Sequence, residues 1–203
     1  MKLYEYEAFP HPRRVRIFLA EKGVDIPREQ VDVPAGEHRR PEFLNKNPDG
    51  TVPVLELDNG RFISETVAIS RYLEEIYPQN PLFGTSAEEK AMVEMWQRRV
   101  EHSLSNAVAS YFHHGTDGLG EADRYRNREW GNKNREAATQ AMRGLDQQLA
   151  NNRYIAGDKF SIADITALCA VDFAKAVDIA MPGGCDHLQR WYEDVSQRHS
   201  AAA

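Results

Sequence analysis

Ser64, Glu65 and Thr66 have the types and the position best suited to chemistry in this chain, because they begin a helical pattern. A helix N-terminus offers unpaired backbone N–H groups and the positive end of the helix dipole, and both favour an anion. The helix follows a strand–turn–strand unit that opens with a Val52-Pro53 step. This order places the helix start beside a strand interrupted by proline, where an extended anionic peptide could dock.

The unit that leads into this helix carries a strong turn signal. The apolar run Val54–Leu57 is followed by Asp58-Asn59-Gly60, and Asn-Gly between two short apolar runs is typical of a tight hairpin. We therefore predict a hairpin and then a helix. The apolar positions of that helix are Val67, Ile69, Tyr72, Leu73 and Ile76.

Composition and charge exclude several kinds of partner. The 203 residues include 25 Lys and Arg against 31 Asp and Glu, which gives a formal net charge of −6 and a pI near 5.7. This balance argues against nucleic acid or an anionic membrane surface as the main partner. No apolar run approaches the roughly 18 residues of a membrane-spanning helix, and residues 1–9 lack the apolar core of a signal peptide. Cys169 and Cys185 form no short-spaced pair, so we expect a cytoplasmic protein with reduced thiols.

The first 77 residues are predicted to alternate between strands and helices. Two prolines after Tyr77 then end the last helix and stiffen a linker. The predicted elements are strands over 2–6 and 26–33, helices over 13–22 and around 41–44, the hairpin, and the helix from residue 65.

After Ser86 the strand signals disappear. Helical patterns cover 87–114, 121–152, 161–179 and 187–198. Ser161-Ile162-Ala163-Asp164 fits a capping box with Asp in the place of the more common Glu or Gln, and we assign it to folding. A mixed α/β part followed by an all-helical part indicates two domains. The predicted division is 1–77, a linker over 78–86, and 87–203.

Four segments together resemble the cytosolic glutathione transferase family, including its bacterial theta- and nu-like members. They are RRVRIFLAEKG (13–23), GEHRRPEFLNKNPDGTVPVLELDNG (36–60), SETVAISRYLEE (64–75) and FSIADI (160–165). Each is a weak signal alone, whereas their joint order and spacing across the chain are specific. The resemblance implies a thioredoxin-like α/β N-terminal domain, an all-α helical-bundle C-terminal domain and a homodimer. It also implies attack of the glutathione thiolate on an electrophile.

The resemblance further implies contacts for the co-substrate glutathione. Glu65 is expected to pair with the γ-glutamyl ammonium, and Thr66 to bind the γ-glutamyl carboxylate through its hydroxyl and backbone N–H. Pro53 is expected to be cis, so that the backbone of Val52 pairs with the cysteinyl part as in strand addition. His38 matches a position that some members use for the glycine carboxylate.

Each of these assignments has a structural alternative. Ser64 or Thr66 would only cap its helix. Pro53 would only start a strand. His38 would belong to a solvated polar loop.

The group that activates the thiol is not evident. A free thiol with a pKa near about 8.5 is mostly protonated at neutral pH, and active family members supply a Tyr, Ser or Cys donor after the first strand. Phe9 occupies the matching position here, and the N-terminal half has no cysteine. We predict Tyr6 first and His11 second as the donor, with backbone amides and the helix dipole after Pro12 as another route. Tyr6 also fits an aromatic packed beneath the first helix, and His11 a rigid turn.

The electrophile pocket is expected between the two domains, lined by Phe9, Tyr111 and His114. The His113-His114 pair has no third ligand at suitable spacing, so we expect no metal.

The prediction is a glutathione S-transferase that joins the glutathione thiolate to small hydrophobic electrophiles. The alternative is a non-catalytic, transferase-like binding or regulatory protein. Isomerisation and reductive dehalogenation are further family chemistries that no residue pattern selects.

Overall fold

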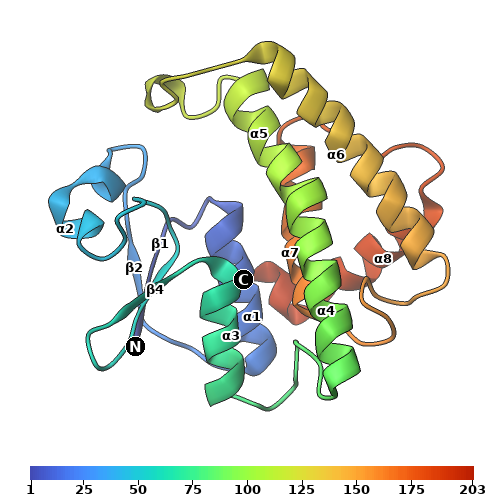
Figure 1. Cartoon of the computed structure of the whole chain (residues 1–203), viewed down its shortest axis with the longest axis horizontal. Helices are drawn as coiled ribbons and strands as arrows, with labels where there is room; N and C mark the ends of the chain where they lie inside the picture. Colours follow the sequence, from blue (N-terminus) through green and yellow to red (C-terminus); the bar gives the residue numbers. More distant parts are fainter. The chain divides into compact units, whose positions relative to one another are not determined.

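The structure is a computed structural model that describes all 203 residues. The chain forms two compact units, one of Met1–Asn80 with Ala202–Ala203 and one of Pro81–Ala201. The first unit holds the only sheet, and the second is built from helices (Figure 1).

The sheet of the first unit has four strands in the order β2-β1-β3-β4. β1 (Lys2–Glu5) pairs in parallel with β2 (Arg28–Gln30) and antiparallel with β3 (Val54–Glu56). β3 pairs antiparallel with β4 (Phe62–Ser64). A parallel pair needs a crossover connection, which α1 (Pro10–Lys22) provides.

The turn between β3 and β4 confirms the predicted hairpin. Gly60 has a φ of 78°, in the left-handed region that glycine adopts at little steric cost. Its N–H donates to the Leu57 carbonyl at 2.9 Å, and the Leu57 N–H donates to the Arg61 carbonyl at 2.8 Å. The chain then enters α3 (Thr66–Ile76), the predicted helix.

Alternation along the strands gives the sheet two apolar faces. Tyr4 and Val54 are cross-strand partners and cluster with Phe43. Leu3 and Leu55 are the next pair along the same strands, so they point to the opposite face. Both are fully buried. In Figure 1, α1 and α3 pack side by side next to the sheet.

The predicted bounds of several elements differ from those observed, and the helix predicted over 121–152 is confined to Arg128–Leu149. The helix predicted over 13–22 begins at Pro10, because a proline lacks the N–H that would have no partner in the first turn. The strand predicted over 26–33 is confined to β2. The short helix predicted near 41–44 is confirmed as α2 (Pro41–Leu44), and a 3₁₀ turn, Glu37–Arg39, precedes it.

The second unit contains five α-helices joined by turns. None of its helices, nor any in the first unit, combines the length and apolar character needed to cross a bilayer. The pattern predicted as one helix over 87–114 is interrupted by a π-helical turn at Glu101–Ser105. The helices are α4 (Ala87–Val100), α5 (Asn106–Gly115), α6 (Arg128–Leu149), α7 (Ile162–Ala176) and α8 (Asp186–Ser196), with 3₁₀ turns at Gly120–Ala122 and His199–Ala202.

Two helices of this unit start with a capping box. At α7 the predicted box is confirmed, because the Asp164 carboxylate accepts the Ser161 N–H at 3.0 Å and the Ser161 side chain pairs with the Asp164 backbone. At α4 the Glu89 N–H donates to Ser86 Oγ at 3.1 Å, and the Ser86 N–H donates to the Glu89 carboxylate at 3.4 Å. The sequence analysis missed this second box, although its Ser-x-x-Glu pattern is visible in the chain.

Candidate active site

The start of α3 has the features of an anion-binding helix terminus. No side chain caps this end, so the first N–H groups, beginning with that of Thr66, point out of the helix unpaired. The side chain of Thr66 is buried and lies at the same first helical position. A bound carboxylate would therefore meet backbone N–H groups, a hydroxyl and the positive end of the helix dipole together.

Glu65 holds an unusual backbone conformation directly before α3. Its φ is 70°, in a region where a non-glycine residue costs about 1–3 kcal/mol. The other two non-glycine residues with positive φ are Asn80 and Asp178, and Asn and Asp tolerate this conformation because they can form local hydrogen bonds. Glu is not among the residue types that tolerate a positive φ in this way. Backbone strain of this kind clusters at ligand sites, which supports a functional role for this position.

Val52 lies just outside the sheet. The Val52–Pro53 peptide bond is cis, as the resemblance predicts. β3 begins only at Val54, so the backbone N–H and C=O of Val52 take no part in the ladder. Val54 pairs with Ser64, and the residues before Val54 and after Ser64 therefore leave the sheet at the same end. This pairing brings Val52 and Pro53 close to the start of α3.

His38 lies in the 3₁₀ turn and is buried, with 8% of its surface exposed. Burial lowers the pKa of its imidazole, and the neighbouring Arg39 guanidinium lowers it further. Its Nδ1 atom is enclosed and has no hydrogen-bond partner. The turn approaches the Val52 segment closely, because a Cβ placed on Gly50 would lie 2.8 Å from the His38 carbonyl oxygen. His38 is thus a neutral donor or acceptor, not the solvated loop residue of the alternative interpretation.

The two predicted thiol donors occupy different environments. The Tyr6 ring is half-buried and packs edge-on against Phe9, with 4.9 Å between ring centroids. His11 is exposed in the first turn of α1, where its Nδ1 lies 3.3 Å from Nη1 of Arg14. The guanidinium of Arg14 can only donate, so this nitrogen of His11 faces a cationic donor. Pro10 and Pro12 lack N–H groups, which reduces the number of backbone donors at this helix start.

Tyr111 and His114 lie three residues apart on α5, so they share one side of the helix. The Arg135 guanidinium lies 5.6 Å from the centre of the Tyr111 ring. His114 Nδ1 accepts the Asn127 N–H at 3.3 Å, and its ring meets that of Tyr125 edge-on at 6.0 Å. The structure therefore brings these two predicted pocket residues together within the helical unit. The third, Phe9, belongs to the first unit.

Two groups of polar and charged residues were not identified from the sequence. One joins Glu5, Arg16 and Gln30 beneath the loop that carries Tyr6. No motif marks it, because its members are separated by 11 to 25 residues. The other pairs His113 Nδ1 with Asp123 Oδ1 at 2.8 Å.

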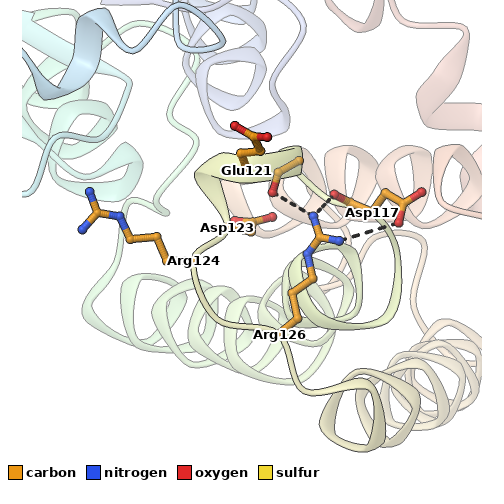
Figure 2. Close-up of a pocket in the computed structure, with 6 residues that line it drawn as sticks. Asp117, Glu121, Asp123, Arg124 and Arg126 are labelled. Carbon is orange, nitrogen blue, oxygen red and sulfur yellow. Dashed lines mark hydrogen bonds and ion pairs between the residues drawn. The ribbon is translucent and has the colours of Figure 1, made fainter.

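The loop between α5 and α6 also encloses an open pocket of about 550 Å³ (Figure 2). Arg126 donates to the carbonyl oxygens of Asp117 and Gly120 at 2.5 and 2.8 Å and forms an ion pair with the Asp117 carboxylate at 3.6 Å. The other side chains that line the pocket are those of Glu121, Asp123 and Arg124. These contacts of Arg126 hold the loop together at one wall of the pocket.

The sheet order, the cis-proline before β3 and the helical second unit define the class of thioredoxin-like transferases with an all-helical C-terminal domain. Comparison with known protein families gives the same class. The family description "Glutathione S-transferase, N-terminal domain" matches residues 3–81, and "Glutathione S-transferase, C-terminal domain" matches residues 106–199. The chain belongs to the glutathione S-transferase family.

Relatives are similar over nearly the whole chain. Glutathione S-transferase 2 of Saccharomyces cerevisiae is 42% identical over 203 residues, covering 98% of this chain and 87% of the relative. The crystal structure of Gtt2 from Saccharomyces cerevisiae has a TM-score of 0.96 at 42% identity and covers 100% of this chain and 99% of that one. A glutathione S-transferase domain-containing protein from Marinobacter aquaeolei VT8 has a TM-score of 0.97 at 46% identity, covering 98% and 99% of the two chains.

Proposed function

We propose that this glutathione transferase joins the glutathione thiolate to small hydrophobic electrophiles. The observation that carries the proposal is the convergence of an uncapped helix start, a strained Glu65 and the free backbone of Val52 at one end of the sheet. Family membership supplies the reaction class. The site supplies a partner for each polar part of the tripeptide.

Glutathione is proposed to bind in an extended conformation across this end of the sheet. The Glu65 carboxylate pairs with the γ-glutamyl ammonium, and Thr66 binds the adjacent carboxylate. The backbone of Val52 pairs with the cysteinyl residue in the manner of an added strand. His38 donates an N–H to the glycine carboxylate, as a neutral group because burial lowers its pKa.

The reaction begins with loss of the thiol proton and attack by sulfur on an electrophilic carbon. The new C–S bond forms from the thiolate electron pair, and in a substitution the leaving group departs with the pair of the broken bond. Tyr6 and His11 remain the proposed donors that stabilise the thiolate. Tyr6 lies in the segment between β1 and α1, and His11 lies in the first turn of α1. An appropriately placed donor here would lower the thiol pKa.

Phe9, Tyr111 and His114 are proposed to line the electrophile subsite. A homodimer, a role in detoxification and a cytoplasmic location are proposed from family membership alone. The absence of a conventional hydroxyl at Phe9 motivated the alternative of a non-catalytic binding protein, and no observation on the fold or among the relatives favours it.

The test is conjugation of glutathione to chlorodinitrobenzene, together with retention on immobilised glutathione. We expect both from the purified protein. The Glu65→Gln variant should raise KM for glutathione about 10-fold, since a hydrogen bond to a charged group contributes about 1.5–3 kcal/mol. Glu75→Gln, an exposed position on the same helix, is the matched control and should leave KM unchanged. Correctly folded protein that neither binds glutathione nor accelerates conjugation would contradict the proposal.

A further inference from the structure

A fully buried carboxylate, that of Glu5, ends β1 directly before the loop to α1. Its Oε2 accepts a hydrogen bond from Nη1 of Arg16 at 2.5 Å, and its Oε1 accepts one from Nε2 of Gln30 at 3.3 Å. Arg16 is itself 6% exposed. A buried ion pair is weak evidence for stability, because desolvation opposes the attraction between the charges.

Glu5 has three partners, of which Arg28 forms an ion pair at 3.8 Å and the other two, Arg16 and Gln30, also hold the backbone of Glu7. Nη2 of Arg16 donates to the Glu7 carbonyl at 2.9 Å, and Oε1 of Gln30 accepts the Glu7 N–H at 2.9 Å. The two backbone groups of one exposed loop residue are thus fixed by two side chains that share a single buried carboxylate. We call this set, Glu5, Arg16 and Gln30, the loop clamp.

The loop has few other backbone anchors. β1 and β2 end at the Glu5–Gln30 pair, so Glu7 lies beyond the ladder. The next contact is within the loop, where the Phe9 N–H donates to the Tyr6 carbonyl at 3.1 Å. The loop clamp therefore fixes the backbone at Glu7, next to Tyr6 in the loop between β1 and α1.

We propose that Arg16 and Gln30, oriented by Glu5, are positioning residues for the transferase reaction. They hold the segment that carries Tyr6 and leads to His11 in the geometry that stabilises the thiolate. This inference rests on the proposed function. A displacement of about 1 Å of a reacting group can cost on the order of 100-fold in rate, so loss of one loop contact should act on kcat.

The test is the variant Gln30→Met, which has a similar side-chain length and removes both of its hydrogen bonds. Gln30 is exposed on a short strand, so the variant should fold. We expect kcat with chlorodinitrobenzene to fall about 10-fold, as for a partial displacement, while KM for glutathione changes less than about 2-fold. The pH profile of kcat/KM should shift to higher pH, because a displaced donor stabilises the thiolate less.

Glu29→Gln is the matched control. It lies on the same strand, and its side chain pairs with Lys2 at the surface and not with the loop clamp. It should keep the kcat, KM and pH profile of the unaltered protein. A second variant, Arg16→Lys, keeps the charge beside Glu5 but lacks the guanidinium fork that reaches Glu7, and should lower kcat in the same manner.

Amide hydrogen exchange at Glu7, measured by NMR, reports the loop clamp independently of turnover. Exchange at Glu7 should become faster in Gln30→Met and stay unchanged in Glu29→Gln.

An unchanged kcat and pH profile in Gln30→Met, with active unaltered protein, overturns this inference alone. Equal losses of glutathione affinity and kcat/KM, with kcat unchanged, also overturn it. An unaltered protein that binds no glutathione overturns the proposed function and the positioning role together.

Discussion

At the scale of single residues, burial decides the charge that His38 brings to a ligand. Its pKa is lowered first by desolvation and then by Arg39. The imidazolium therefore forms only below the ordinary pKa of about 6.5. At neutral pH a carboxylate bound at this position meets an N–H dipole and not a cation, and the contact is expected to be insensitive to pH.

Replacement of His38 tests this assignment. His38→Ala should weaken glutathione binding about 10-fold, since it removes a hydrogen bond to a carboxylate, and His38→Gln should recover part of the loss. The affinity contributed by His38 should be constant from about pH 7.5 to 8.5, because this range lies above the ordinary imidazole pKa of about 6.5 and burial lowers the pKa of His38 further. Calorimetric titration with glutathione measures both effects, with the exposed His187→Ala as the control. A steep loss of affinity as the pH rises from 6 to 8 would instead show that a cation binds the ligand.

At the scale of elements, the two capping boxes show how a helix start can depend on one carboxylate. At α4, Glu89 accepts hydrogen bonds from the backbone N–H groups of Thr85 and Ser86 and from the Thr85 hydroxyl, and it pairs with Lys159 at 2.8 Å. The Lys159 and Thr85 contacts lower the pKa of Glu89 to about 2. The charged form of this side chain thus contributes to holding α4 at its observed start.

The pH dependence of stability tests the Glu89 box. Its folded-state pKa is below the ordinary value, so the stabilisation is complete above about pH 4.5 and is lost as the pH falls towards about 2. Glu89→Gln should lower Tm by a few degrees at pH 6, and the difference from the unaltered protein should shrink as the pH falls to 3. Glu88→Gln, one residue away in the same turn, serves as the control. A Tm difference that stays constant between pH 6 and 3 would argue against this role.

At the scale of the whole molecule, each of the two units combines buried apolar residues with buried polar contacts. The first unit has a sheet with an apolar cluster on each face. The second has a buried polar tie, in which Asp164 accepts hydrogen bonds from the Ile155 N–H, the Ser161 N–H and hydroxyl, and the Trp191 indole. Burial raises the pKa of Asp164, and these hydrogen bonds oppose that shift. One carboxylate thereby connects α7, α8 and the segment before α7.

Removal of this tie should destabilise the helical unit. Asp164→Ala leaves buried N–H donors unsatisfied, and each costs about 1–3 kcal/mol. We expect the free energy of unfolding to fall by about 3–5 kcal/mol, because more than one buried donor loses its acceptor. Urea denaturation followed by tryptophan fluorescence measures it, since all three Trp residues belong to this unit. Asp158→Ala, at an exposed position, should change the midpoint little. Equal midpoints for the two variants would refute the role of the tie.

Much of the fold follows from local patterns, because turns, caps and helix stops act over a few residues. The hairpin at Asp58-Asn59-Gly60, the capping box at Ser161 and the short helix near 41–44 were predicted in this way. The break at Glu101–Ser105 was missed, since the helical period continues across it. The glutathione contacts of Glu65 and Val52 came from the family resemblance, and they stay predictions.

The residue types in this chain were enough to indicate two domains, the helix start at Thr66 and the lack of an obvious thiol donor. Only the folded structure brings Glu5, Arg16 and Gln30 around one carboxylate, buries His38 and turns the Glu65 backbone to a positive φ. The physical reason is the separation along the chain over which each interaction acts. Propensity and capping depend on neighbours along the chain, whereas desolvation and charge pairing depend on which distant segments pack together.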